Sequence, residues 1–339
     1  MKLNPNKIPV NQPCVICNGH ESRALIDLDF EQFGYPGKFH LRQCVSCNLI
    51  FNSPRLLDQE FPKLYDANYY FFSQTAQQAI AHVKSQYLRS IALIEHEHAP
   101  TSRRIVEIGS AKGYYLALLK ALGWTVQGVE LSAFAASFAE RMFDIPVFNG
   151  TVETYSDQCK ERFDVVAAFD VIEHVLAPDK FVRAISQLLK TGGTLILDTP
   201  NGNAKHIQTH RELWSGFIPF HIYFFNQQNL QRLLEKYGFS VSTAFSYNNA
   251  FQSYQERKKM VEPSLKEKIY ETLGIRGALS VLKNRVMLIG ETKSRLNKLI
   301  AQAAADVQKM PKYMDTPDAS LPLAATLEGE NLVIIARKL

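Results

Sequence analysis

The chain has 339 residues, of which 46% are hydrophobic, 21% charged and 11% aromatic, and its formal net charge is +5. This balance is typical of a globular protein and excludes a disordered tail, a collagen-like fibre and a disulfide miniprotein. The net charge is too small to indicate a nucleic-acid-binding protein by itself. No apolar run approaches the roughly 18 residues that span a bilayer, and residues 1–10 leave no room for a signal peptide. We therefore expect a cytoplasmic protein.

Four of the five cysteines form two C-x-x-C pairs, Cys14 with Cys17 and Cys44 with Cys47. Two residues between paired cysteines let both thiolates turn toward one ion, and two such pairs complete a tetrahedral sulfur shell for zinc. The alternatives are disulfides and redox chemistry. A chain without an export signal keeps its thiols reduced, and a redox motif normally occurs once. We therefore predict a closed structural zinc site, with Cys159 as an ordinary cysteine.

The zinc-binding module is predicted over residues 1–60. Residues 27–33 and 38–42 flank a turn that contains Gly34, Pro36 and Gly37, so a hairpin is expected between the cysteine pairs. The module is too small to hold a good apolar core unaided, so the metal would stabilise it.

A bridge is predicted over residues 61–100. Its aromatic cluster, which includes Tyr69 and Tyr70, either packs against the main domain or lines a ligand pocket. A stripe with helical spacing follows, and it predicts one amphipathic helix: Ile80, Val83, Tyr87, Ile91 and Ile94.

From residue 103 onward, short apolar strands alternate with helices. Strands that are apolar on both faces and separated by helices indicate an α/β protein with a parallel sheet covered on both sides, the doubly wound layout. Ligands in this layout bind beyond the carboxyl ends of the strands. Strands are predicted over residues 105–108, 126–131, 146–148, 163–169, 194–198, 241–245 and 331–336, and helices over 114–122, 133–143, 179–189 and 226–237.

The first of these strands ends in a glycine loop, E-I-G-S-A-K-G, at residues 107–113. Gly109 lets the backbone approach a ligand, and Gly113 opens the following helix. Glu130 ends the second strand, where a carboxylate is placed to accept hydrogen bonds from ribose hydroxyls. The loop lacks the G-x-G-x-x-G spacing of a dinucleotide site, so the pattern favours a nucleoside ligand.

Five motifs in order resemble those of class I S-adenosylmethionine-dependent methyltransferases. The C-x-x-C pairs, followed by N-S-P at 52–54 and the tyrosines near residue 70, are similar to the N-terminal module of bacterial sugar and polysaccharide methyltransferases. The resemblance implies a seven-stranded Rossmann-like sheet over residues 101–247 plus 328–339, whose last two strands are antiparallel. The motifs are E-x-G-x-x-x-G at 107–113, Glu130, F-D-V-V at 163–166, D-V-I-E-H-V at 170–175 and L-K-x-G-G at 189–193.

The resemblance also implies S-adenosylmethionine as cofactor and a role for each matching position. The glycine loop runs alongside the methionine part and the ribose of the cofactor. Glu107 contacts the methionine end or supports the loop, and Glu130 holds the ribose. Residues 149–153 contribute adenine contacts, and Asp170 faces the sulfonium. The cofactor-binding residues so implied are Glu107, Gly109, Ser110, Gly113, Glu130, Leu131, Thr151 and Asp170.

In methyl transfer the acceptor must lie in line with the S–CH3 bond, and a hydroxyl or carbon acceptor must also lose a proton, so a general base helps. The candidates are Glu173 with His174, His221 and Tyr70. In sugar C-methyltransferases of the zinc-module group, a Glu-His pair precedes Tyr-Phe. Here Phe220 precedes His221, which leaves O-methylation at least as plausible as C-methylation.

Residues 248–327 form an insertion before the last strand, with helical periodicity where the family has a short connection. Residues 255–313 contain 13 Lys and Arg against 6 Asp and Glu. Three interpretations remain open. The segment is a solvated helical hairpin or homodimer contact, a lid that recognises phosphate on the acceptor, or a basic amphipathic helix that rests on the anionic surface of the inner membrane.

The leading hypothesis is methyl transfer to a saccharide or related small molecule, on oxygen or carbon. One alternative is an RNA methyltransferase, but Lys and Arg do not outnumber Asp and Glu in residues 1–60, and no Asn-Pro-Pro-Tyr motif follows the fourth strand. Others are a natural-product N- or O-methyltransferase and a non-catalytic binding module. Gly109, Gly113 and Glu130 are intact, which argues against loss of the cofactor site.

Overall fold

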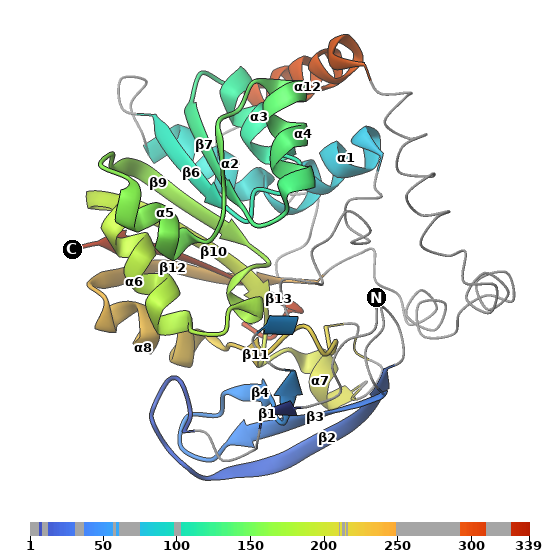
Figure 1. The fold of residues 1–339 in the computed structure, drawn as a ribbon, viewed down its shortest axis with the longest axis vertical. Coiled ribbons are helices and arrows are strands. Elements are labelled where there is room, and N and C mark those ends of the chain that lie inside the picture. The colour runs from blue at the N-terminus through green and yellow to red at the C-terminus, as the bar shows by residue number, and fades with distance from the viewer. Residues whose placement is uncertain are drawn as a thin grey trace, which may run out of the picture.

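The computed structural model describes residues 7–8, 13–30, 37–56, 59–60, 75–97, 103–209, 211, 214, 216–248, 292–309 and 327–339. These residues form a large α/β part and a smaller β module beneath it (Figure 1). Within the described residues, no helix has both the length and the apolar character needed to cross a membrane.

The large part contains a seven-stranded sheet. Its strands are β6 (Arg104–Ile108), β7 (Thr125–Glu130), β8 (Val147–Asn149), β9 (Phe163–Phe169), β10 (Leu189–Pro200), β12 (Phe239–Tyr247) and β13 (Asn331–Lys338). The order across the sheet is β12-β13-β10-β9-β6-β7-β8. From β10 to β8 all neighbours are parallel, whereas β13 is antiparallel to both β10 and β12. The doubly wound fold class and the antiparallel final pair are therefore confirmed.

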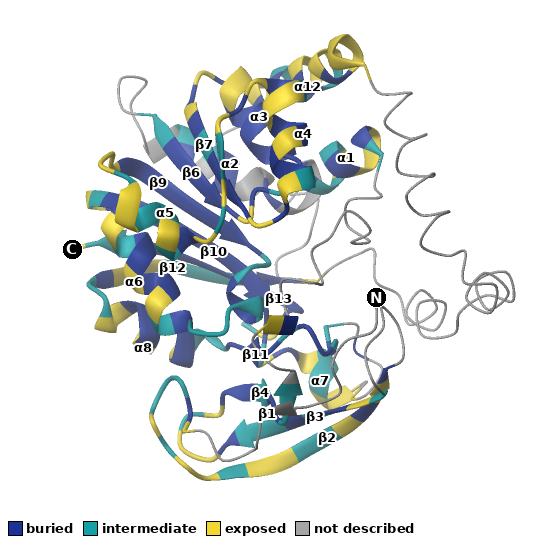
Figure 2. Cartoon of the chain, in the orientation of Figure 1, coloured by how far each residue is buried: buried dark blue, intermediate teal, exposed yellow. Residues whose placement is uncertain are grey.

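Helices cover both faces of this sheet, and alternate strand residues face opposite layers. In β9, Val165 and Ala167 pack into one hydrophobic cluster, and Val166 and Ala168 pack into the other. Figure 2 shows that the central strands are buried on both sides, as their continuous apolar sequences predicted. One layer contains α1 (Ala76–Gln86), α2 (Leu88–Glu97), α3 (Tyr114–Ala121), α4 (Ala133–Phe143) and α12 (Lys293–Gln308); the other contains α5 (Val152–Gln158), α6 (Pro178–Leu188) and α8 (Gln227–Lys236).

The cysteine-bearing module forms a second sheet with the order β11-β4-β3-β2. The predicted hairpin is confirmed as the antiparallel pair of β2 and β3. Strand β11 comes from the large part, so this sheet joins the two parts of the molecule. Phe30 of the module also meets Phe220 edge to face, with ring centroids 5.7 Å apart. The strands are β2 (Ser22–Phe30), β3 (Gly37–Cys44), β4 (Ile50–Asn52) and β11 (Tyr223–Phe224), and a short pair, β1 (Lys7–Ile8) with β5 (Arg55–Leu56), lies beside them.

The single helix predicted for the bridge is wrong, because the structure has two helices that meet at Tyr87. Thr75 begins α1 with a capping box that includes Gln78. The break leaves the Tyr87 ring buried and stacked on Phe169 of β9, with centroids 4.0 Å apart. The apolar stripe was read correctly, but periodicity alone does not detect a break that preserves the buried face.

Only a part of the basic insertion lies within the described residues. Its helix α12 packs against α1, α3 and α4, and Lys293 pairs with Asp144 at the end of α4, with Nζ and Oδ2 2.6 Å apart. Leu296 and Ile300 are buried in this contact, as their helical spacing predicted. The described portion is thus a packing element on the outer helical layer (Figure 1). The periodic residues 269–289 lie outside the described residues.

Candidate active site

The glycine loop connects β6 to α3 as predicted. Gly109 and Gly113 have φ values of 74° and 76°. A Cβ at Gly109 would lie 2.6 Å from Cγ2 of Val171, and a Cβ at Gly113 would lie 2.8 Å from Cβ of Ala139. Both positions therefore require glycine for conformation and for space. The resulting loop is tight enough for its backbone to approach a ligand closely.

Glu130 holds this loop in place from the end of β7. Its Oε2 accepts a hydrogen bond from the Ala111 amide at 2.8 Å, and its Oε1 accepts one from the Ser132 amide at 2.7 Å. Burial raises the pKa of this carboxyl, while the amide donors oppose that shift. Carboxylate oxygens have more than one lone pair, so Glu130 can position the loop and accept ribose hydroxyls together.

Two buried polar atoms beside the loop have no hydrogen-bond partner among the described residues, Oε2 of Glu107 and Oγ of Ser110. Burial, and secondly the nearby Glu130 carboxylate, raise the pKa of Glu107 well above its ordinary value. An unsatisfied buried polar atom costs about 1–3 kcal/mol. The two atoms therefore indicate a place for a polar ligand that donates hydrogen bonds. S-adenosylmethionine carries ribose hydroxyls and an ammonium group, so these residues fit the predicted cofactor.

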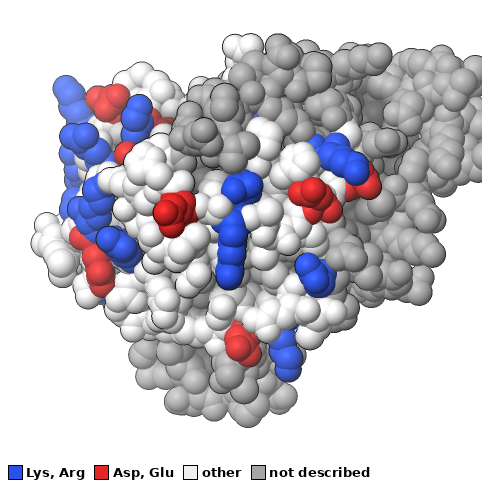
Figure 3. Space-filling model, turned by 90° about the horizontal axis from the view of Figure 1, so that it is seen from below, with Lys and Arg blue, Asp and Glu red and all other residues white. Residues whose placement is uncertain are grey.

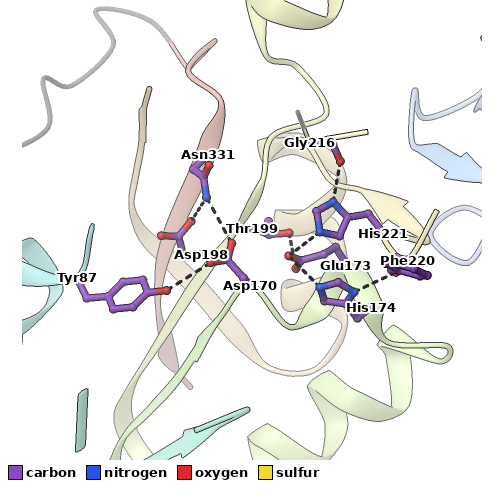
Figure 4. A network of polar contacts seen from close by, with 10 residues as sticks. All are labelled: Tyr87, Asp170, Glu173, His174, Asp198, Thr199, Gly216, Phe220, His221 and Asn331. Carbon is purple, nitrogen blue, oxygen red and sulfur yellow. Dashed lines mark hydrogen bonds and ion pairs between the residues drawn. The ribbon is translucent and has the colours of Figure 1, made fainter. Parts of the chain in front are cut away.

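Two carboxylates lie at the carboxyl ends of neighbouring strands, Asp170 after β9 and Asp198 in β10 (Figure 4). Nδ2 of Asn331 donates to both, at 3.5 Å to Oδ1 of Asp170 and 3.2 Å to Oδ1 of Asp198. The Tyr87 hydroxyl donates to Asp170 at 3.3 Å, and the Tyr247 hydroxyl donates to Asp198 at 2.6 Å. Burial raises the pKa of Asp170 to about 6 and that of Asp198 well above its ordinary value. This end of the sheet is therefore a place for a positively charged group.

Glu173, His174 and His221 form a compact cluster beside these carboxylates (Figure 4). Glu173 is fully buried in the 3-10 turn Ile172–His174, and its Oε1 lies 3.8 Å from Nε2 of His174 and 4.0 Å from Nε2 of His221. Its other oxygen accepts a hydrogen bond from the Thr199 hydroxyl at 2.9 Å. The structure therefore brings together three of the four predicted catalytic residues.

Backbone carbonyls fix the orientation of both rings. Nδ1 of His174 lies 3.0 Å from the Phe220 carbonyl oxygen, and Nδ1 of His221 lies 2.8 Å from the Gly216 carbonyl oxygen. Because a carbonyl oxygen only accepts, Nδ1 carries the proton in each neutral ring and Nε2 has the lone pair. Burial lowers the pKa of His174 to about 4, and burial first and the Asp170 charge second raise the pKa of Glu173 well above its usual range.

The other predicted site residues have different outcomes. Leu131 is 49% exposed beside the loop. Thr151 begins α5, and its hydroxyl accepts a hydrogen bond from the Thr154 amide at 3.3 Å, so it has a capping role besides any contact with adenine. Tyr70, like Tyr69, lies outside the described residues. The roles assigned to these positions stay predictions.

Sequence reasoning missed five residues of the polar network. Asp198 had a usable signal, because it is a carboxylate near the end of an apolar strand in the layout that binds ligands there. The other four are brought to the site by tertiary packing, and no local pattern marked them as site residues: Tyr87, Thr199, Tyr247 and Asn331.

The two cysteine pairs come together in the module as predicted. Sγ of Cys14 lies 3.5 Å from Sγ of Cys47, and Sγ of Cys17 lies 3.5 Å from Sγ of Cys44. All four sulfurs lie within 4.8 Å of one another. The four cysteines form no disulfide. Zinc with Zn–S bonds of about 2.3 Å separates its tetrahedral ligands by about 3.8 Å, so this donor set fits the predicted ion.

Both cysteine pairs adopt the same turn. Asn18 donates its amide to the Cys14 carbonyl at 2.8 Å, and Asn48 donates its amide to the Cys44 carbonyl at 3.0 Å. The two asparagines have φ values of 58° and 59°, a left-handed conformation that asparagine tolerates. Two equivalent turns thus bring four thiols together, which is the donor set of a structural zinc site.

Comparison with known proteins finds a family match for just under half of the chain. Residues 79–244 match the family model described as a methyltransferase domain. The chain is similar to ubiquinone biosynthesis O-methyltransferases. It is 32% identical over 108 residues to that of Alkalilimnicola ehrlichii, and the match covers 30% of this chain and 44% of the relative. It is 31% identical over 130 residues to that of a Caulobacter species, and the match covers 35% of this chain and 52% of the relative. The chain thus spans about half the length of these curated relatives.

Similar solved structures include a SAM-dependent methyltransferase from Archaeoglobus fulgidus, with a TM-score of 0.46 and 16% identity, covering 80% of this chain and 100% of that one. Another is the magnesium protoporphyrin IX methyltransferase of Synechocystis, with a TM-score of 0.44 and 15% identity, covering 55% and 89%. The family match over 79–244 coincides with the glycine loop, Glu130 and the fourth-strand motif described above. Residues 79–244 are thus identified as a methyltransferase domain.

Proposed function

We propose that the chain transfers the methyl group of S-adenosylmethionine to an oxygen of a small-molecule acceptor. The observation that carries the proposal is the proximity of two features at one end of the sheet. One is the set of buried carboxylates on the cofactor side, and the other is the Glu173–His174–His221 cluster, where an acceptor proton can be handled.

The electrostatics of the site support a cationic cofactor. S-adenosylmethionine carries a sulfonium and an ammonium group, and the site presents Glu107, Glu130, Asp170 and Asp198, all with raised pKa values. Carboxylates crowded in a poorly solvated place repel one another, and a bound cation relieves that repulsion. We assign the ribose to Glu130 and the sulfonium end to Asp170.

The chemistry that remains for the protein is alignment and removal of one proton. As the acceptor oxygen attacks the methyl carbon, the C–S bond breaks and its electron pair stays on sulfur, which yields S-adenosylhomocysteine. Glu173 lies three residues beyond Asp170 along the chain, and the Nε2 atoms of His174 and His221 lie 3.8 Å and 4.0 Å from its Oε1. We propose that this cluster positions the acceptor hydroxyl and handles its proton.

We propose a saccharide as the acceptor class, on the similarity of the cysteine module to sugar and polysaccharide methyltransferases. The relatives named for ubiquinone biosynthesis are O-methyltransferases and support oxygen as the nucleophile. Binding to a nucleic acid depends on a strongly basic surface. The described surface visible in Figure 3 carries acidic side chains among the basic ones, with Lys and Arg gathered mainly at one edge.

We further propose that the cysteine tetrad holds one structural zinc ion. The support is the four-sulfur geometry and the repeated turn. Four thiolates leave the ion no open position for chemistry, so its role is to stabilise a module whose apolar core is small.

Calorimetric titration of the zinc-loaded, full-length protein with S-adenosylmethionine tests the core of the proposal. We expect saturable binding that Glu107→Gln and Glu130→Gln weaken, while Glu140→Gln on the exposed face of α4 serves as the charge-matched control. Release of S-adenosylhomocysteine is then measured with sugar nucleotides, lipid-linked saccharides and phenols as acceptors. Absence of cofactor binding would overturn the proposal, and turnover with phenols alone would overturn the saccharide assignment.

A further inference from the structure

We propose that Glu173, His174 and His221 form a binding site for a divalent transition-metal ion, distinct from the cysteine tetrad, at which an oxygen of the acceptor is held. The role of the ion in methyl transfer rests on the proposed function.

The separations of the donor atoms suit one ion. Oε1 of Glu173 and the Nε2 atoms of His174 and His221 all lie within 4.8 Å of one another, and the two carboxylate–imidazole separations are 3.8 Å and 4.0 Å. An ion with tetrahedral bonds of about 2.1 Å separates its ligands by about 3.4 Å. The two carboxylate–imidazole separations are about 0.4 and 0.6 Å longer than this value, so the donor atoms lie close to the spacing that one ion requires.

The rings are already oriented as ligands. A metal-binding imidazole characteristically donates its second N–H to a carbonyl or carboxylate, which fixes the ring and raises its basicity. The carbonyl oxygens of Phe220 and Gly216 take the Nδ1 protons of His174 and His221. Both Nε2 lone pairs consequently point inward toward the same carboxylate oxygen (Figure 4).

Glu173 gives the independent observation that points to a ligand. Its side chain is fully buried, and among the described residues its Oε1 has no hydrogen-bond donor, although its Oε2 is held by Thr199. A buried carboxylate oxygen that faces two imidazole lone pairs is unfavourable unless a positive species lies among the three atoms. The carboxyl groups of Asp170 and Asp198 lie near it, and a bound cation would relieve the repulsion among the three groups.

The donor set indicates the class of ion. Two imidazoles and one carboxylate suit first-row divalent ions such as Mn²⁺, Fe²⁺, Co²⁺ or Zn²⁺, whereas four thiolates select zinc or other soft ions. Three protein ligands leave at least one position open. An ion held there would lower the pKa of an acceptor hydroxyl at the open position, as it does for metal-bound water, and the proton would pass to solvent. The oxygen would then form the new O–C bond as the C–S bond breaks and its electron pair stays on sulfur.

Mn²⁺ is the probe, because it prefers nitrogen and oxygen ligands and leaves a zinc-filled cysteine tetrad untouched. Full-length protein that holds one zinc ion per chain, the content of the cysteine tetrad, is titrated with MnCl2, and free Mn²⁺ is followed by electron paramagnetic resonance. We expect one Mn²⁺ per chain, with ¹⁴N couplings from imidazole in pulsed spectra. His174→Ala and His221→Ala should each raise the dissociation constant at least about tenfold. His40→Ala is the control and should leave the dissociation constant unchanged, because the His40 ring pairs with Asp27 in the module, with Nδ1 and Oδ1 2.9 Å apart.

Absence of Mn²⁺ binding, binding without ¹⁴N couplings, or equal affinity in both cluster variants and the wild type would overturn the metal site. Zinc content and circular dichroism check that each variant is folded. Glu173→Gln is a third variant in which one ligand of the proposed ion is removed. Calorimetry with S-adenosylmethionine is run on the same samples. Cofactor binding without Mn²⁺ binding refutes the metal site only, whereas Mn²⁺ binding without cofactor binding refutes the proposed methyl transfer only.

Discussion

Replacement of Asp170 by asparagine should stabilise the protein and weaken its binding of S-adenosylmethionine. Asp170 has a φ of 52°, and asparagine tolerates this left-handed conformation as aspartate does. The side chains also have the same shape. The substitution therefore removes a charge and one acceptor oxygen without straining the backbone, so its effect on stability reports the electrostatics of the site.

The magnitude follows from the hydrogen bonds and the pKa. A folded-state pKa of about 6 against an ordinary 3.8 corresponds to at most about 3 kcal/mol of unfavourable free energy for the ionised group at neutral pH. Asparagine accepts from only one of the two donors, Tyr87 and Asn331, and the lost hydrogen bond costs about 1 kcal/mol. We therefore expect a net gain of about 1–2 kcal/mol in the free energy of unfolding at pH 7.

The pH dependence has a definite sign. Between about pH 4 and pH 6 folded Asp170 keeps a proton that the unfolded chain has released, so the contribution of this group to wild-type stability falls as pH rises through that window. The gain from Asp170→Asn should be full above pH 6 and absent near pH 4. Urea unfolding at both pH values and cofactor titration at pH 7 provide the measurements. Destabilisation at pH 7 by more than about 1 kcal/mol, the expected loss of one hydrogen bond, would refute this reasoning, and unchanged cofactor affinity would remove Asp170 from the sulfonium site.

Three further changes test other parts of the site. Gly109→Ala should destabilise the protein by about 1–3 kcal/mol and abolish cofactor binding, because the new Cβ would collide with Val171. Gly192→Ala is the control: Gly192 has a φ of 75° but open space around it, so this variant should show only the smaller cost of the backbone conformation. Equal melting temperatures of the two variants would contradict the steric argument. Glu130→Gln should weaken cofactor affinity about tenfold and lower the free energy of unfolding by about 1–3 kcal/mol, because one loop amide loses its acceptor. Calorimetry measures the affinity, and urea unfolding measures the stability. An unchanged affinity would remove the ribose role of Glu130. Cys14→Ser should lower the zinc content below one ion per chain and should reduce turnover more than it reduces cofactor affinity. Metal analysis and steady-state kinetics measure these effects. A full zinc content in the variant would exclude Cys14 as a ligand.

The parts of the fold that the sequence predicted correctly depend on local patterns. The strand over residues 163–169 and the helix over 133–143 have the predicted bounds, because a continuous apolar run and an amphipathic stripe each mark their own ends. Gly109 and Gly113 were also predictable, since a turn that requires positive φ selects glycine at fixed positions.

The parts that escaped prediction depend on contacts between distant segments. Tyr87 and Asn331 reach Asp170 from opposite ends of the domain sequence, and neither lies in a pattern that differs from ordinary packing residues. His221 was a candidate base from its position, but the sequence does not reveal that its Nε2 shares Oε1 of Glu173 with His174. That arrangement depends on where the loop before β11 meets the 3-10 turn.

The cysteine module helps to determine that meeting point. The amide of Asn52 in β4 donates to the Ile222 carbonyl at 2.8 Å, and the amide of Ile222 donates to the Glu173 carbonyl at 2.7 Å. The Asn52 side chain donates to the Pro219 carbonyl at 3.0 Å. His221 lies within this run of hydrogen bonds, whereas the glycine loop and Glu130 lie outside it. An ion in the tetrad that stabilises the module would therefore act on the acceptor side of the site and leave the cofactor side largely unaffected, which is why loss of a cysteine ligand should reduce turnover before it reduces cofactor affinity.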